Sequence, residues 1–298
     1  MRGAKLGRSW QLHVMMMPGI LLVLVFMYGP MPGIVLAFKD FIPTKGIFGS
    51  DWVGLETFAY MMDLPDSMQV FWNTLKIAFL KIVFNFPIPI IVAILINEVR
   101  KAVFKRTVQT MIYLPHFLSW VILSGIFIDL FSQTGIVNKA LGLFGISPIF
   151  FMGEPGHFIK LLIATDVWKN FGYSTIIYLA AITGIDDSLY ESARIDGANR
   201  FKQIWHITLP GLSPIILLVL TLSLGGILDA GFDQVFNMYN PLVWSSSDII
   251  DTYVYRLAIV EANYSLGTAI GLLKSVVGFV LIVTSYLIAK KYSDYTIF

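Results

Sequence analysis

Hydrophobic positions in this chain fall into long continuous runs that are separated by shorter polar segments. A bilayer core about 30 Å thick is crossed by about 20 apolar residues in a helix. Six runs reach that length, so we predict six transmembrane helices at about residues 12–38, 71–97, 108–131, 158–183, 210–230 and 268–289. Continuous apolar runs differ from the alternating pattern of a membrane β-barrel. The predicted fold is therefore an all-α integral membrane protein.

Composition supports this interpretation. Charged residues make up 13% of the chain, hydrophobic residues 56%, and the mean hydropathy is +0.74, whereas soluble domains carry about a quarter charged residues. The first apolar run exceeds the length of a signal-peptide core and no A-x-A-like cleavage site follows it, so we expect a retained first span. The chain has no cysteine, which excludes disulfides and thiolate metal sites, and its net charge of +2 is too small to indicate a nucleic-acid partner.

Basic residues gather on one side of the predicted membrane. They lie before the first run, between the second and third, between the fourth and fifth, and after the sixth: Arg2, Lys5, Arg8, Arg100, Lys101, Lys105, Arg106, Arg194, Arg200, Lys202, Lys290 and Lys291. The opposite side is rich in acidic residues, including Asp51, Glu56, Asp63, Asp248 and Glu261. Because cytoplasmic loops carry the excess of lysine and arginine, we predict that both termini are cytoplasmic.

Prolines interrupt several of the predicted spans, namely Pro18, Pro30, Pro32, Pro87, Pro89, Pro115, Pro210 and Pro214. Proline removes a backbone donor and breaks or kinks a helix. In a membrane such a break is tolerated where other helices or a water-lined cavity satisfy the freed backbone groups. Two interpretations stay open at this point: simple kinks that aid packing, or breaks beside a polar passage.

The polar loop at residues 186–206, between the fourth and fifth runs, reads as helix, turn, helix. Asp186 or Asp187 is placed to cap the first short helix. Gly197 permits a left-handed turn after it, and Phe201 and Ile204 begin an apolar stripe on a second helix. Small side chains at Ser192, Ala193 and Ala198 leave room for a partner surface. We expect a docking element on the cytoplasmic face; the alternative is an interhelical loop without a partner.

This loop resembles the coupling-loop signature of binding-protein-dependent ABC importer permeases. The spacing agrees at Glu191, Ala193, Asp196, Gly197, Ala198, Ile207, Leu209, Pro210 and Pro214, whereas Ser192 replaces an alanine and Ile204 stands where phenylalanine is frequent. The resemblance extends over nearly the whole chain. It looks closest to the sugar (maltose-type) branch, particularly permeases for complex oligosaccharides and polysaccharide fragments, with weaker support from 167–172, 240–241 and 251–256.

The resemblance implies a single type I permease domain over residues 1–298 in the bacterial inner membrane. Its implied partners are a second permease chain, a dimer of ATP-binding subunits, an extracellular solute-binding protein and an oligosaccharide substrate. The implied mechanism is alternating access, in which ATP and Mg²⁺ are bound only by the partner ATPase and this chain supplies no catalytic or metal-binding residue. Consistently, the sequence has no G-x-x-x-x-G-K-[ST] phosphate loop. The implied ATPase contact consists of Glu191, Ser192, Ala193, Asp196, Gly197, Ala198 and Phe201.

Polar residues inside the predicted spans are candidates for the substrate path, because charged groups there are costly and face protein or water. The candidates are Asn73, Trp168, Lys169, Asn170 and Tyr173. Asp166 and Lys169 are three residues apart, a spacing at which helical residues can pair. The alternative is such an ion pair at the membrane interface, with Trp168 in an aromatic belt. Lys76 and Lys81 reach the interfaces by snorkelling only if the second span is shorter than predicted.

The last outer loop, residues 231–267, carries a second group of candidates: Asn240, Trp244, Tyr253, Tyr255 and Arg256. We expect it to fold back toward the pore or to meet the binding protein, unless these side chains only pack the loop. Two other functions stay open. One is a stand-alone ion-coupled or passive transporter, although such proteins usually show internal repeats and none is evident here. The other is an ABC permease for a non-sugar solute.

Overall fold

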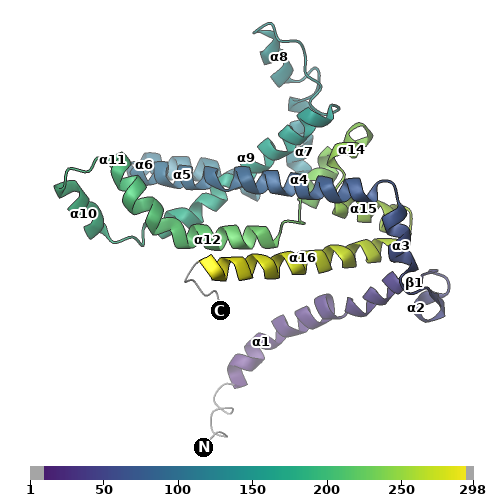
Figure 1. Cartoon of the computed structure of the whole chain (residues 1–298). Coiled ribbons are helices and arrows are strands. Elements are labelled where there is room, and N and C mark those ends of the chain that lie inside the picture. Colours follow the sequence, from purple (N-terminus) through teal and green to yellow (C-terminus); the bar gives the residue numbers. More distant parts are fainter. Residues whose placement is uncertain (1–9, 293–298) are drawn as a thin grey trace, which may run out of the picture. The chain divides into compact units, whose positions relative to one another are not determined.

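The computed structural model describes residues 10–292, and most of them are helical (Figure 1). Contacts divide the chain into two compact units. The first unit combines the chain up to Leu64 with Val254–Leu273, and the second combines Pro65–Tyr253 with the chain from Lys274 onward. Each unit is described by itself.

The first unit begins with a long apolar helical run that changes its winding at prolines and glycines. Helix α1 (Trp10–Val23) continues through a π-helical turn, η2 (Leu24–Tyr28), and a 3₁₀ segment, η3 (Met31–Phe38). Pro30 and Pro32 cannot donate to the preceding turn, which explains the change of winding. Only 6% of the most apolar window of this run is buried inside the chain. Such a surface suits lipid or another apolar partner.

The rest of the first unit is a small polar cap. Strand β1 (Lys39–Asp40) pairs antiparallel with β2 (Asp51–Trp52), and the short helices α2 (Gly46–Gly49) and α3 (Glu56–Asp63) flank them. Segment η7 (Arg256–Val260) leads into the start of α16 (Tyr264–Tyr292). The hydroxyl of Ser265 accepts from Phe41 N at 2.9 Å and donates to Lys39 O at 2.6 Å. The beginning of α16 is thereby joined to β1.

The second unit is a bundle of helices. Along the chain these are α4 (Ser67–Asn85), α5 (Pro87–Glu98), α6 (Ala102–Tyr113), η4 (Leu114–Phe117), α7 (Trp120–Leu130), α8 (Ile136–Gly142), α9 (Pro155–Ile182), α10 (Asp187–Ile195), α11 (Arg200–Gln203), η5 (Ile204–Thr208), α12 (Leu209–Gly225), α13 (Phe232–Met238), η6 (Pro241–Val243) and α14 (Trp244–Ser247). Helix α15 (Ile250–Tyr255) and α16 each extend across the boundary between the units.

Helix α9 is the central element of this bundle, and α4, α5, α6 and α12 all pack against it. Figure 1 shows it in teal beside α4 and α5. One apolar cluster surrounds the first half of α9 and includes Phe158 and Leu162; another surrounds Tyr178 and Ile182 in its second half. Gly172 lets α6 approach so closely that a Cβ there would collide with the backbone carbonyl of Ile112.

The prediction of a helical membrane fold is confirmed apart from the short β1–β2 pair, but the count of six spans is not. Among residues 10–292, four helices are long and apolar enough to cross a membrane: Leu12–Phe38, Ser67–Glu98, Arg200–Gly225 and Tyr264–Leu287. The third predicted span is two helices, α6 with η4 and then α7, which meet at a bend of 100°. Proline at position 115 accounts for the break. The fourth is a continuous helix, α9, that lies outside this apolar set; it carries Asp166 and Lys169 in its apolar run and packs against α4, α5, α6 and α12.

Candidate functional site

The loop at residues 186–206 has the predicted helix, turn, helix structure. Asp186 caps α10, because its carboxylate accepts from Ser188 N at 2.9 Å; this backbone hydrogen bond lowers the pKa of Asp186 below its usual range. Two residues after the end of α10, Gly197 adopts a left-handed conformation with a φ of +75°. Gly197 N donates to Arg194 O at 3.1 Å and Ala198 N to Ala193 O at 2.8 Å, the two bonds of a Schellman motif.

A second cap follows at once. Asn199 accepts from Lys202 N at 2.9 Å and begins α11, a role that the sequence analysis missed although asparagine is a favoured N-cap residue. The loop is also fastened to the bundle. Arg200 forms an ion pair with Glu98 at the end of α5, and the hydroxyls of Tyr190 and Thr208 lie 2.9 Å apart, joining α10 to η5. The loop is thus an ordered element rather than a flexible connection.

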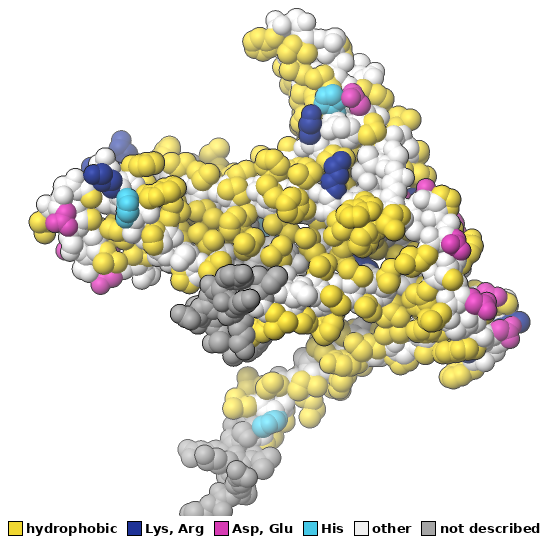
Figure 2. Space-filling model, viewed as in Figure 1, with side chains coloured by type: hydrophobic (Ala, Val, Ile, Leu, Met, Phe, Trp, Pro, Cys, Tyr) yellow, Lys and Arg dark blue, Asp and Glu magenta, His cyan; other side chains and the backbone are white. Residues whose placement is uncertain are grey.

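The outer surface of the loop combines charge with exposed apolar side chains. Every residue of α10 is at least partly exposed, and Ile195 reaches 87% exposure. Phe201 and Trp205 are 72% and 60% exposed and stack with their ring centroids 6.4 Å apart. Figure 2 shows charged side chains gathered at the end of the second unit that carries α10 and α11. Apolar patches rimmed by charge are typical of protein contact sites.

The predicted ATPase-contact residues all belong to this surface. Glu191, Ser192, Asp196, Gly197 and Phe201 are exposed, and Ala193 and Ala198 are half-buried. Ser192 turns its hydroxyl back to Ser188 O at 2.9 Å. The loop therefore brings the predicted residues onto one continuous segment, while the partner contact itself stays a prediction.

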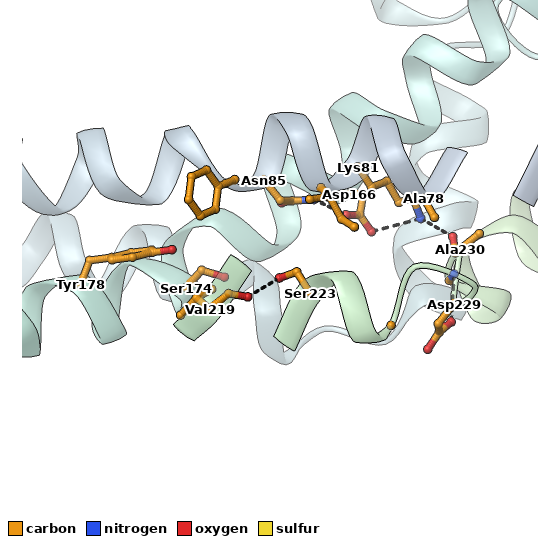
Figure 3. Close-up of a pocket in the computed structure, with 14 residues that line it drawn as sticks. Ala78, Lys81, Asn85, Asp166, Ser174, Tyr178, Val219, Ser223, Asp229 and Ala230 are labelled. Atoms are coloured by element: carbon orange, nitrogen blue, oxygen red, sulfur yellow. Dashed lines mark hydrogen bonds and ion pairs between the residues drawn. The ribbon is translucent and has the colours of Figure 1, made fainter. Parts of the chain in front are cut away.

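A polar pocket of about 320 Å³ lies in the second unit, among α4, α9, α12 and the segment after α12 (Figure 3). Its walls include Lys81 and Asn85 from α4, Asp166, Ser174 and Tyr178 from α9, and Ser223 and Asp229 from α12 and the segment after it. Phe86, at the junction of α4 and α5, adds an aromatic side chain. The break before Pro87 thus lies beside a polar pocket, which agrees with the second interpretation of the prolines at this site.

The ion pair in this pocket joins two helices and differs from the predicted one. Lys81 Nζ lies 3.3 Å from Asp166 Oδ1, and Asn85 donates to the other carboxylate oxygen at 2.7 Å. Lys81 also donates to Ala230 O at 2.7 Å and to Gln234 Oε1 at 2.5 Å. The proposed pairing of Asp166 with Lys169 is wrong. Snorkelling by Lys81 is wrong as well, because this side chain is buried, whereas Lys76 is exposed.

Lys169 instead satisfies the backbone at the bend between α6 and α7. Its ammonium donates to His116 O at 2.7 Å and to Leu118 O at 2.8 Å, and lies 3.5 Å from Pro115 O. It also lies 5.6 Å from the centroid of the Trp120 ring. The carbonyls of His116 and Leu118 lie where the broken helix ends, a place where carbonyls lack donors from a following turn, and the buried ammonium of Lys169 bonds to both of them. Lys169 thus makes its direct contacts with the bend, and Asp166 makes its ion pair with Lys81.

Three of the predicted substrate-path residues, Lys169, Asn170 and Tyr173, lie at this bend, and none of the five lines the pocket. Trp168 and Tyr173 are each 44% exposed, Tyr173 stacks on His116 with a centroid distance of 4.0 Å, and Asn170 lies 3.2 Å from the same histidine. Asn73 lies apart from them, donating to Ser245 O at 3.2 Å. Their contact with substrate stays a prediction. The pocket residues Asn85, Ser174 and Tyr178 were missed; the polar spacing of Lys81 and Asn85, one helical turn apart in an apolar run, was the available signal.

The outer-loop candidates are mostly part of the packed structure. Asn240 caps η6 by accepting from Leu242 N at 3.0 Å and donates to Met152 O at 2.7 Å. Tyr253 is buried, while Trp244 is 37% exposed. Tyr255 and Arg256 are half-buried and belong to the first unit. The residues predicted as one group thus divide between the two units, and their contact with a binding protein stays a prediction.

Comparisons with known proteins agree with the geometry. The family model of the binding-protein-dependent transport system inner membrane component matches residues 85–294. Protein LplB of Bacillus subtilis (strain 168) is 43% identical, covering 99% of this chain and 93% of that protein. The polygalacturonan/rhamnogalacturonan transport system permease protein YteP of the same organism is 42% identical, covering 97% and 91%.

Solved structures of similar shape point the same way. A chain from the crystal structure of a bacterial ABC transporter involved in the import of the acidic polysaccharide alginate has a TM-score of 0.90 and 36% identity, covering 97% of this chain and 98% of that one. A second structure, of a bacterial alginate ABC transporter in complex with an alginate pentasaccharide-bound periplasmic protein, has a TM-score of 0.88 and 36% identity, covering 97% and 96%. This chain is therefore a multi-pass membrane protein that belongs to the family of binding-protein-dependent transport system inner membrane components, the permeases of ABC importers.

Proposed function

We propose that this chain is one permease subunit of an ATP-driven importer in the bacterial inner membrane, and that it carries oligosaccharides handed over by an extracellular binding protein. The observation that carries the proposal is the capped, fastened loop at residues 186–206 with its exposed apolar side chains. The names of the similar proteins, which transport polygalacturonan, rhamnogalacturonan and alginate, support a saccharide cargo. In this proposal a separate ATPase dimer binds ATP and Mg²⁺, and a second permease chain completes the passage.

The fastenings of the loop suggest how movement reaches the pocket. When a bound partner moves α10, the ion pair between Arg200 and Glu98 transmits this movement to α5. The hydrogen bond between Tyr190 and Thr208 transmits it to η5 and α12. The opposite ends of α5 and α12 lie at the pocket, where Phe86 and Ser223 form part of its wall. Rigid helices transmit displacement along their length, so a motion at one end reaches the other. Closure of the ATPase dimer would then open or close the pocket by moving these two helices.

The orientation and the other contacts belong to the same proposal. The basic loops support a cytoplasmic location for α10, α11 and both chain termini. The outer loop at 231–267 meets the binding protein, with Trp244 as its exposed aromatic candidate. Trp168 and Tyr173 offer aromatic faces on which a sugar can stack along its path.

A charge reversal at Glu191 tests the proposal. Glu191 is exposed, so Glu191→Lys leaves the fold intact while it places the wrong charge in the contact. We expect about a tenfold or greater loss of ATP-dependent uptake in proteoliposomes that contain the full importer, because removal of one close charge contact at an interface costs about 2 kcal/mol or more. Glu56→Lys, an exposed glutamate at the start of α3, is the matched control. Normal uptake by Glu191→Lys, with normal recovery of the ATPase subunits, would contradict the docking role.

A further inference from the structure

The lining of the pocket has an unpartnered acceptor, and its one cationic side chain, Lys81, is fully engaged. Lys81 directs its ammonium to Asp166, Ala230 O and Gln234, which accounts for its three N–H groups. The amide nitrogen of Asn85 donates to Asp166, whereas its oxygen is buried and has no partner among residues 10–292. An acceptor in that position requires a donor from a ligand or from water.

Two hydroxyls extend this surface. Tyr178 is only 1% exposed, lines the pocket, and finds no hydrogen-bond partner within the described chain; Figure 3 shows its hydroxyl directed toward Ser174. The Ser174 hydroxyl, also in the wall, is likewise without a partner among those residues. A buried tyrosine hydroxyl usually has a partner. Both hydroxyls are therefore available to bond with a ligand or with water in the pocket.

The charge of the pocket narrows the choice of that molecule. One lysine and two aspartates, Lys81, Asp166 and Asp229, line it, which gives a net charge of −1. The lysine is already neutralised by Asp166, so the second aspartate is the excess charge. A carboxylate on the ligand would be repelled by this negative charge and would find no free cation to pair with. Hydroxyl groups on the ligand, in contrast, can donate hydrogen bonds to the unpartnered acceptors of the wall.

We propose that this pocket binds one uncharged glycosyl unit of the transported oligosaccharide and disfavours a uronic acid unit at the same position. The proposal rests on the proposed function and adds the class of sugar. A volume of about 320 Å³ lies at the lower end of the range of small-ligand pockets, about 300–1,000 Å³, and suits a single sugar unit. Phe86 and Tyr178 supply aromatic surface for the apolar face of the ring, and Asn85, Ser174 and Tyr178 bind its hydroxyls.

The absence of cysteine from the sequence makes a direct test practical. Ser174→Cys introduces a thiol of nearly the same size into the pocket wall. The complete importer is purified and placed in lipid nanodiscs without its binding protein, and the rate at which a small methanethiosulfonate labels this chain is measured by mass spectrometry. The probes are matched pairs: tetrasaccharides of galacturonate, rhamnogalacturonan and alginate, each in its native acidic form and with its carboxylates reduced to alcohols. Ser245→Cys, an exposed position outside the pocket wall, is the matched control.

We expect at least one reduced probe to slow labelling at position 174 about fivefold or more, while its acidic partner has less than half that effect and the control position is unaffected. The Asp229 carboxylate accepts a hydrogen bond from Gly231 N at 3.2 Å. Asp229→Asn keeps a side-chain oxygen for this bond and removes the excess charge. This variant should reduce the difference in protection between the acidic and the reduced probe by about fivefold. That is the effect expected from one partly screened charge interaction. Tyr178→Phe should weaken protection by the reduced probe about two- to tenfold, as loss of one hydrogen bond does, whereas Tyr60→Phe, a tyrosine outside the pocket, should leave it unchanged.

Three results would overturn the inference. Equal or stronger protection by the acidic form removes the proposed selectivity. Import of a probe by the complete system in proteoliposomes, without any protection at position 174, places the sugar elsewhere and leaves the proposed function standing. If no probe is imported although the ATPase is active, the proposed function itself fails, and this inference fails with it.

Discussion

Helices α1 and α9 are both long and both belong to an integral membrane chain, yet they differ in what surrounds them. The run that starts with α1 is apolar on all sides, and its side chains are almost all exposed within the chain. Helix α9 carries Asp166 and Lys169 at its middle and buries both. In a bilayer the more apolar sequence lies at the surface, and the more polar one lies where other helices satisfy it. The polar helix is also the one that lines the pocket.

Breaking the ion pair between α4 and α9 should produce the largest effect. Lys81→Met leaves the Asp166 carboxylate buried without its cation, a change that costs about 3–5 kcal/mol at buried pairs. We expect the purified complex to lose most of its folded chain, measured as the monodisperse fraction in detergent and as its Tm. The double variant Lys81→Met with Asp166→Leu removes both charges and should recover much of that stability. A single variant as stable as the parent would show that the pair is not buried.

Removing the cation at the bend should have the next largest effect. Lys169→Met deprives the carbonyls of His116 and Leu118 of their donor, and hydrogen bonds to charged groups contribute about 1.5–3 kcal/mol each. We expect a clear fall in the Tm of the complex. Lys76→Met, an exposed lysine on α4, is the matched control and should change the Tm little. A similar fall for both variants would contradict the special role of Lys169.

Matched glycine substitutions compare the two helices directly. Gly172→Ala in α9 pushes a methyl group against the Ile112 carbonyl, which should separate α6 from α9 and cost about 1–3 kcal/mol. Gly19→Ala in α1 meets nothing within 4 Å, and alanine favours the helix by about 1 kcal/mol over glycine. The first variant should lower the Tm and the second should leave it unchanged or raise it. Equal responses would show that surroundings do not distinguish these helices.

The smallest effect should come from protonation of the cap of α10, a helix that is exposed like α1 but polar. Because the folded pKa of Asp186 is lowered, its capping contribution is present above the unfolded pKa of about 3.9 and is lost as the pH falls through the lower folded value. We expect binding of the ATPase subunits to weaken slightly below about pH 4, in a pull-down that holds salt constant. Asp186→Asn keeps a capping oxygen that does not titrate, so the binding of the ATPase subunits by this variant should no longer depend on pH in this range.

Local features of the chain were predictable from the sequence because local chemistry determines them. The turn at Gly197 and the cap at Asp186 each depend on neighbours a few residues away. The partner of Asp166 was not predictable in the same way. Spacing along one helix favoured Lys169, whereas the actual cation, Lys81, comes from another helix and depends on how the two helices pack. The pocket was missed for the same reason, since its walls come from three helices, α4, α9 and α12, and from the segment after α12.

The hydrogen bonds of Ser265 have a consequence for biosynthesis. This serine joins strand β1, near the beginning of the chain, to the start of α16, which is made close to its end. The first unit combines residues that leave the ribosome early with others that leave it late. Strand β1 therefore gains these two hydrogen bonds only after the start of α16 has been synthesised. Premature termination before that helix would deprive the earliest part of the chain of these contacts as well.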